Sequence, residues 1–169
     1  FHDHEPHPTQ RLTTAGVLAV SSNTGSIKIG EMLSNDKLYE YLTKFGIGTK
    51  TGSGLPGESR GILPKVADWS GTTAPTVAFG QGYSLTAMQA TSVFATIAND
   101  GVRVSPTVIA GTSDSSGNYT PSATRESVRV ISAETAAQMR LMMESVVSAN
   151  GTAPSAAIPG YRVAGKTGT

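Results

Sequence analysis

Apolar residues recur at helical spacing in several stretches of this chain. Residues 12–20 are rich in Ala, Val and Leu, and residues 24–33 resume a helical pattern after a short polar triplet. This pattern predicts two helices joined by a turn at Ser21-Ser22-Asn23. Ser34 and Asn35 are suited to cap a third helix, because an apolar stripe follows at i, i+3, i+4 and i+7. The stripe consists of Leu38, Tyr41, Leu42 and Phe45.

Two further helices are predicted in the second half of the chain. One begins near Ser84 and ends between Asn99 and Gly101. Its apolar positions are Leu85, Met88, Phe94 and Ile97. Ser132 is suited to cap the other helix, which ends at Asn150-Gly151. Its apolar side carries Met139, Met142, Met143, Val146 and Val147.

Alternation of apolar and polar residues predicts a small amount of strand. Residues 102–105 and 128–130 alternate, and the polar connection 112–124 between them favours a β-hairpin with a long loop. Residues 161–164 also alternate, which predicts a strand leading into the last four residues. The glycine-rich stretch 46–61 is expected to be irregular and rich in turns.

Composition narrows the class of protein. A length of 169 residues, with 38% hydrophobic and 15% charged residues, suits one globular domain with its own core. No linker or repeat interrupts residues 1–169, so we expect a single α+β unit. A formal net charge of +1, without long runs of either sign, argues against a nucleic-acid partner. The chain has no cysteine, and its apolar runs are far shorter than the roughly 20 residues that span a bilayer.

The triplet Ser21-Ser22-Asn23 is the first candidate for chemistry. A serine hydroxyl can relay a proton, and an asparagine amide can both donate to and accept from a substrate peptide group. The same residue types are common in turns and helix caps, so the triplet alone also has a purely structural interpretation.

The closing string Lys166-Thr167-Gly168-Thr169 is the second candidate. On an edge strand beside an acyl-transfer site, Lys166 would supply positive potential and the hydroxyls of Thr167 and Thr169 could bind a carboxylate. Gly168 would let a ligand approach the backbone, and the Thr169 N–H could stabilise an oxyanion. We expect the Ser21 hydroxyl and the Lys166 ammonium to face one cleft, about 3 to 4 Å apart.

The same string permits a competing hypothesis. Gly160, Gly165, Lys166 and Thr167 fit the phosphate-binding pattern G-x-x-x-x-G-K-[ST]. That pattern needs a strand before its first glycine and a helix after its lysine. Pro159 and the strand-like alternation of residues 161–164 argue against this nucleotide-binding interpretation.

Two other patterns favour structural interpretations. Ser34-Asn35-Asp36-Lys37 fits S-x-x-K, but Ser34 occupies a helix-cap position. A cluster of histidine and acidic residues lies between His2 and His7, near the beginning of the chain. Metal ligands are normally drawn from more than one element, so no metal site and no cofactor is predicted.

Taken together, the motifs resemble those of the class B penicillin-binding proteins, above all their septal, cell-division transpeptidases. An S-x-N and a K-T-G triplet occur in that order in these enzymes. The resemblance extends from about residue 12 to the end of the chain. It also rests on Phe45-Gly46-Ile47-Gly48, Gly54-Leu55-Pro56-Gly57-Glu58, Gly80-Gln81-Gly82 with Thr86 and Gln89, Ile97-Ala98-Asn99-Asp100-Gly101, and Gly160-Tyr161.

The resemblance implies an α+β fragment of the penicillin-binding transpeptidase and serine β-lactamase-like fold: most of its helical part, a hairpin and the K-T-G strand. It implies that Ser21 takes part in proton relay, that Lys166 assists Ser21 electrostatically, and that Asn23 binds a substrate or drug amide. Thr167 and Thr169 would bind the terminal carboxylate beside Gly168, which also belongs to the substrate-binding residues, and the Thr169 N–H would be half of the oxyanion hole. Ala87 stands where many relatives have proline.

The implied activity is cross-linking of peptidoglycan by acyl transfer from D-Ala-D-Ala stem peptides, with β-lactams as inhibitors. The nucleophilic serine of S-x-x-K should precede Ser21, and residues 1–20 do not contain it, so the chain alone is expected to be inactive. The implied partners are divisome membrane proteins, including a lipid II glycosyltransferase. The implied location is the outer face of the bacterial cell membrane, with an anchor upstream of this chain. A D,D-carboxypeptidase, a β-lactamase or a penicillin sensor without turnover stays open as an alternative.

Overall fold

The computed structural model describes residues 1–123 and 125–168. Within these residues the chain forms short α-helices, two 3₁₀ helices and two pairs of strands. In chain order they are α1 (Thr14–Ala19), α2 (Asn23–Gly30), α3 (Asn35–Lys44), η1 (Val66–Asp68), α4 (Thr73–Ala78), α5 (Ala87–Ala98), β1 (Val102–Val104), β2 (Gly111–Ser113), β3 (Tyr119–Pro121), β4 (Ser127–Arg129), α6 (Ala133–Val147) and η2 (Pro154–Ala156).

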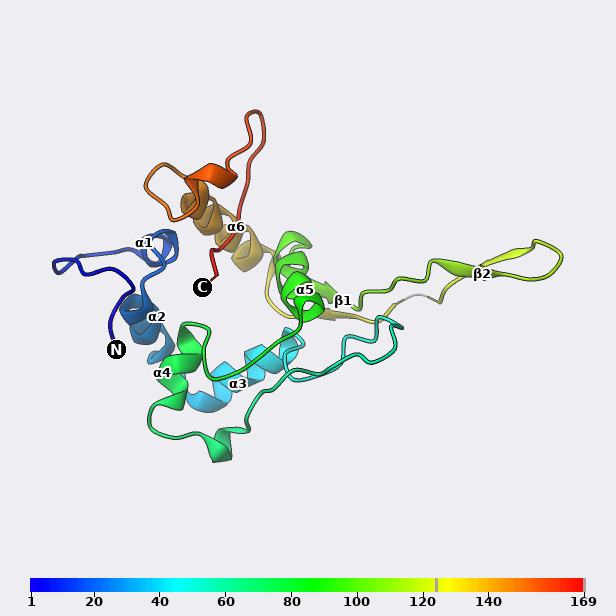
Figure 1. Cartoon of the computed structure of the whole chain (residues 1–169), viewed down its shortest axis with the longest axis horizontal. Helices are drawn as coiled ribbons and strands as arrows, with labels where there is room; N and C mark the ends of the chain where they lie inside the picture. The colour runs from blue at the N-terminus through cyan, green and yellow to red at the C-terminus, as the bar shows by residue number, and fades with distance from the viewer. Residues whose placement is uncertain (124, 169) are drawn as a thin grey trace.

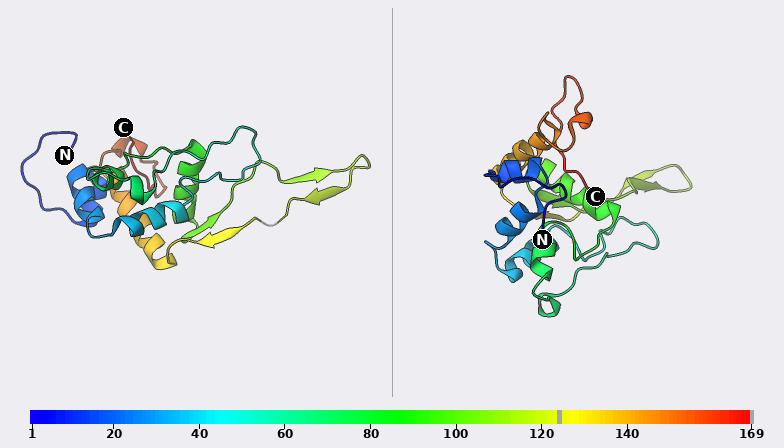
Figure 2. Two further views of the ribbon diagram at one scale, coloured as in Figure 1. Left: turned by 90° about the horizontal axis from the view of Figure 1, so that it is seen from below. Right: turned by 60° about the vertical axis from the view of Figure 1, so that its left-hand side comes forward.

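The helices pack in a few pairs, and one arm projects from them. Helix α6 contacts both α1 and α5, α5 also contacts β1, and α2 packs against α4 (Figure 1). The hairpin β2–β3 extends away from the helices in every view (Figure 2). The buried apolar residues come mainly from α1, α2, α4 and α6. They are Val17, Ala19, Ile27, Ile47, Val77, Val130, Ala136, Met143, Val146 and Val147.

Most of the predicted helices are present, and their predicted caps are in place. Ser34 accepts a hydrogen bond from the Lys37 N–H at 3.2 Å, and Ser132 accepts one from the Thr135 N–H at 3.1 Å. Helix α5 begins at Ala87, slightly later than predicted, because Thr86 and Gln89 form a capping box there. Helix α4 was not predicted, since its six residues are too few to show a helical period.

The predicted hairpin is confirmed, but its connection is more ordered than expected. Strands β1 and β4 pair antiparallel with Val102 opposite Arg129. The connection was predicted to be a loop, yet β2 and β3 pair within it as a second hairpin. The Asp114 carboxylate closes the tip by accepting the N–H groups of Ser116 and Asn118, both at 2.9 Å. Local turn chemistry therefore orders a segment that has little apolar pattern.

The strand predicted at residues 161–164 is not formed. No segment among the described residues pairs with it, and the chain from residue 162 to residue 168 has no regular secondary structure. A strand requires ladder hydrogen bonds to a neighbour, so alternation of side chains alone does not produce one. The prediction of a K-T-G strand is therefore wrong for this structure. The predicted mixture of helices with little sheet is confirmed.

Helix α5 buries polar rather than apolar side chains. Gln89 is 1% exposed, whereas Phe94 on the same helix is 43% exposed. The Gln89 Nε2 donates to the carbonyl oxygens of Thr49 at 2.8 Å and Arg60 at 2.9 Å. Gln89 thereby holds the irregular segment 46–61 against the helix by satisfying carbonyls that no regular structure pairs.

Replacing this side chain should therefore weaken the whole fold. We expect Gln89→Ala to lower the free energy of unfolding by about 2 to 4 kcal/mol, because buried carbonyls lose their donors and a cavity remains. Urea unfolding followed by circular dichroism measures the change. Thr91→Ala, on the exposed face of α5, is the matched control and should stay within about 0.5 kcal/mol of wild type. Equal stability of Gln89→Ala and Thr91→Ala would contradict this assignment.

Candidate active site

The Ser21-Ser22-Asn23 triplet forms the corner between α1 and α2. The Ser21 N–H donates to the Leu18 carbonyl at 3.2 Å, and the Ser22 N–H donates to the Val17 carbonyl at 3.0 Å. These two bonds constitute a Schellman motif, in which glycine usually occupies the left-handed position. Here Ser21 occupies it, with φ of 55°, although a residue with a Cβ is disfavoured there by about 1 to 2 kcal/mol.

The middle serine of the triplet is buried and structural. The Ser22 hydroxyl accepts the Gly25 N–H at 2.9 Å and so caps α2. Helix α1 approaches closely at this point: a Cβ on Gly25 would lie 2.7 Å from a methyl carbon of Val17. Glycine at this position allows the two helices to meet immediately behind the corner.

Lys166 reaches this corner from the other end of the chain. Its ammonium donates to the Ser21 Oγ at 2.6 Å and to the Thr167 carbonyl at 3.0 Å. The predicted meeting of the two groups is present, at a shorter distance than the expected 3 to 4 Å. Desolvation by burial lowers the pKa of Lys166 below its ordinary value. Lys166 and Ser21 thus form the two sides of one polar site.

Helix α6 and the residues after it bring the two sides together. The Thr152 N–H donates to the Ala19 carbonyl at 3.0 Å, and the Thr152 hydroxyl lies 2.9 Å from the Thr167 hydroxyl. The Gly165 N–H donates to the Met143 carbonyl of α6 at 3.3 Å. The red C-terminal segment in Figure 1 accordingly runs back past α6 toward the blue N-terminal helices.

The other predicted site residues are placed as follows. The Asn23 Nδ2 donates to the backbone carbonyl of His2 at 3.2 Å, so one of its two N–H bonds is engaged by the N-terminal segment. Gly168 is exposed beside Thr167. Thr169 lies outside the described residues.

The nucleotide-binding hypothesis finds no support in the local structure. A turn, not a strand, precedes Gly160, and no helix follows Gly165 among the residues described. Lys166 contacts Ser21 instead of lying within a glycine-rich cradle.

The two patterns interpreted as structural also have structural partners. Lys37 pairs with Glu40 at 2.9 Å, three residues along α3. Near the beginning of the chain, the Asp3 carboxylate accepts the Thr24 N–H and the Ser22 hydroxyl, both at 2.8 Å. Among the described residues, no group of three or more His, Cys, Asp or Glu side chains is arranged to hold a metal ion.

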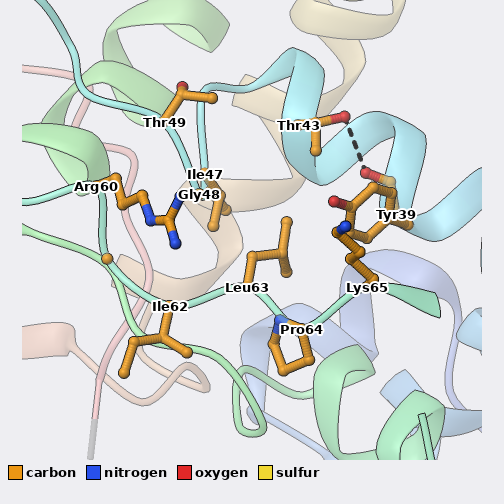
Figure 3. A pocket seen from close by; sticks show the side chains of 11 residues that line it. Tyr39, Thr43, Ile47, Gly48, Thr49, Arg60, Ile62, Leu63, Pro64 and Lys65 are labelled. Atoms are coloured by element: carbon orange, nitrogen blue, oxygen red, sulfur yellow. Dashed lines mark hydrogen bonds between the residues drawn. The ribbon is translucent and has the colours of Figure 1, made fainter. Parts of the chain in front are cut away.

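A separate pocket of about 290 Å³ lies between α3 and the irregular segment that follows it (Figure 3). Tyr39 and Lys65 lie at one end of it and Arg60 at the other. Neither Ser21 nor Lys166 lines this pocket. It is therefore distinct from the site formed by the two motifs.

The arrangement of motifs has a counterpart in known proteins. Residues 1–169 match the family profile described as the penicillin-binding protein transpeptidase domain. The chain belongs to the penicillin-binding protein transpeptidase family. Its relatives place it among the class B members, as the resemblance of its motifs implied.

Two relatives and one solved structure illustrate the similarity. Penicillin-binding protein PbpB of Mycobacterium tuberculosis is 42% identical over 174 residues, which cover 99% of this chain and 26% of that protein. Stage V sporulation protein D of Bacillus subtilis is 39% identical over 158 residues, covering 90% of this chain and 24% of the relative. The crystal structure of penicillin-binding protein 3 from M. tuberculosis with aztreonam superposes with a TM-score of 0.96 at 41% identity, covering 98% of this chain and 38% of that one.

The chain thus spans about a quarter of the length of these curated relatives. The high TM-score confirms the predicted fold class, a partial transpeptidase domain of mixed helix and small sheet.

Sequence reasoning missed three groups that hold the transpeptidase motifs in place. They are the Thr152 hydroxyl beside Thr167, the Asp3 carboxylate beside Ser22 and the His2 carbonyl beside Asn23. Thr152 follows a glycine after α6, and Asp3 belongs to a cluster that first suggests metal binding. Neither position carries a local signal for these contacts, because each partner is distant in sequence.

The strained corner leads to a test of stability. Ser21→Gly and Ser21→Ala both remove the hydroxyl, but only glycine relieves the left-handed backbone. We expect Ser21→Gly to be more stable than Ser21→Ala by about 1 kcal/mol, measured by thermal or urea unfolding. If Ser21→Ala were the more stable of the two, the Schellman assignment at this corner would be wrong.

Proposed function

We propose that this chain forms the S-x-N and K-T-G side of the active site in a serine-type peptidoglycan D,D-transpeptidase. The main support is the 2.6 Å hydrogen bond from Lys166 to Ser21 in a chain of this family. The reaction transfers an acyl group from a stem peptide ending in D-Ala-D-Ala to an amine of a neighbouring strand. The nucleophilic serine belongs to the S-x-x-K element, which residues 1–20 lack.

The hydrogen-bond pattern suggests how Ser21 acts. A serine hydroxyl has one O–H donor and two acceptor lone pairs, and Lys166 occupies one lone pair as donor. The Ser21 proton is consequently available to the leaving nitrogen of D-alanine, or to the ring nitrogen of a β-lactam. Lys166 can replace that proton, and the lowered pKa of its ammonium makes such a transfer easier.

The remaining motif residues provide binding groups. Asn23 keeps an amide oxygen and a second N–H for the substrate amide. The Thr167 hydroxyl, positioned by Thr152, is suited to the terminal carboxylate or to its β-lactam equivalent. Gly168 leaves room for the ligand beside the backbone, and the Thr169 N–H supplies half of the oxyanion hole.

Substrates, inhibitors and location follow from the same proposal. Solved structures of M. tuberculosis penicillin-binding protein 3 contain aztreonam and ampicillin, and we propose that β-lactams also acylate the protein that carries this chain. Its natural substrates are peptidoglycan stem peptides on the outer face of the cell membrane. Its proposed partners are divisome membrane proteins, including a lipid II glycosyltransferase. The proposal, as implied by the family resemblance, includes a membrane anchor upstream of this chain. No helix of the described residues is both long and apolar enough to cross a membrane.

Penicillin labelling of the full-length protein tests the proposal. A fluorescent penicillin should form one covalent adduct, at a serine preceding residue 1 that is followed three positions later by lysine. Ser21→Ala and Lys166→Ala should each slow acylation by about 10²-fold or more, because proton transfer to the leaving nitrogen is lost. Lys37→Ala removes a lysine that contacts Glu40 and the Tyr41 ring on α3, and this variant should label at the wild-type rate.

Several outcomes would change the assignment. A folded protein that is not labelled at all would overturn it. Magnesium-dependent ATP binding that disappears in Lys166→Ala would favour the nucleotide-binding alternative. Product analysis separates the related enzymes: a transpeptidase yields cross-linked peptide, whereas a D,D-carboxypeptidase or a β-lactamase yields hydrolysed substrate.

A further inference from the structure

The N-terminal segment lies across the start of α2 and contacts the three residues that follow Ser21. The Asp3 carboxylate accepts the Ser22 hydroxyl through Oδ2 and the Thr24 N–H through Oδ1, both at 2.8 Å. The carbonyl of the preceding residue, His2, accepts the Asn23 amide at 3.2 Å. His2 and Asp3 therefore hold three consecutive residues, Ser22 to Thr24, at the start of α2.

The Asp3 side chain is largely shielded from solvent and accepts several hydrogen bonds. It is 10% exposed, and its third contact is His7 Nε2, at 2.8 Å from Oδ2. Burial by itself raises the pKa of Asp3, but the hydrogen bonds from Thr24, His7 and Ser22 outweigh it and lower the pKa to about 2. The carboxylate stays ionised at neutral pH and lies at the N-terminus of α2, where the helix dipole also favours a negative charge.

The contact with His2 fixes which way the Asn23 amide faces. One N–H of Asn23 is held by the His2 carbonyl, so the oxygen and the other N–H have a defined orientation. A rotation of the amide by half a turn would place two carbonyl oxygens against each other. The position of the His2 carbonyl depends in turn on Asp3, the next residue, being held by Ser22 and Thr24.

We propose that Asp3 is a positioning residue for substrate recognition: by clamping the N-terminal segment to the start of α2, it orients the Asn23 amide toward the amide group of the acyl donor. This inference rests on the proposed function, in which Asn23 binds that amide. Asp3 itself is not expected to touch the substrate.

The test compares two penicillins on the full-length protein. Ampicillin carries a side-chain amide, whereas 6-aminopenicillanic acid has the same ring system without it. The quantity of interest is the ratio of their second-order acylation rates, measured by competition with a fluorescent penicillin. A general loss of stability lowers both rates together and leaves this ratio unchanged, so the ratio reports orientation of Asn23.

We expect Asn23→Ala to lower the ratio by about 3- to 10-fold, the range of one hydrogen bond. Asp3→Asn, which keeps the shape of the side chain but not its charge, should lower the ratio by a similar factor. The double variant Asp3→Asn with Asn23→Ala should have the ratio of Asn23→Ala alone, because both changes act through one amide.

Control variants separate this role from folding. Glu5→Gln removes a carboxylate two residues away that is 83% exposed and lies 3.7 Å from His4, and it should keep the wild-type ratio. Ser22→Ala breaks one contact of the clamp without removing the charge and should also lower the ratio. Ser22→Ala thus supplies the measurement if Asp3→Asn does not fold.

The outcomes are distinct. If both penicillins acylate the wild-type protein, but Asp3→Asn and Ser22→Ala both keep the wild-type ratio, this inference alone is overturned. A double variant whose ratio falls well below that of Asn23→Ala would overturn it as well. A wild-type protein that neither penicillin acylates would overturn the proposed function, and this inference with it.

Discussion

The hydrogen bond between Lys166 and Ser21 joins side chains that are 145 positions apart, and the site depends on it. The local structure around each of these two residues does not by itself bring the two side chains together. Helix α6 provides the connection, because it packs on α1 and also accepts the Gly165 N–H at the Met143 carbonyl. Thr152 adds a second link by bonding to both the end of α1 and Thr167. The chemistry of the two motifs therefore depends on packing between helices that carry neither motif.

Features that neighbouring residues determine could be predicted from the sequence. The caps at Ser34 and Ser132 and the irregular segment 46–61 depend on side chains and glycines only a few positions away. The pairing of β1 with β4 was also accessible, because alternation marks both strands. The site motifs were recognisable for another reason. Their residue types, and the order in which they occur along the chain, are typical of one family, and recognising them requires no knowledge of the local structure.

Three features that depend on distant partners were not predicted correctly. The alternation at residues 161–164 predicted a strand, but a strand also requires a neighbour to bond with. Gln89 is buried because its side chain donates to carbonyl groups of the segment 46–61. The apolar pattern of α5 does not indicate that these carbonyls require a donor. Asp3 likewise resembles part of a metal cluster until its contacts with Ser22 and Thr24 are known. Gln89 bonds to carbonyls 40 and 29 positions away, and Asp3 bonds to groups 19 and 21 positions away. No described segment pairs with residues 161–164.

Ser21 shows how the fold accommodates a residue that local structure disfavours. A Schellman corner favours glycine, yet a glycine would have no hydroxyl to accept the Lys166 ammonium. The strain of about 1 to 2 kcal/mol is tolerable only where the surroundings fix the backbone on both sides. Here the carbonyls of α1 hold one side, while the Ser22 cap and the Asp3 carboxylate hold the other. The Asp3 contacts that we propose to orient Asn23 therefore also support the strained backbone of Ser21 next to it.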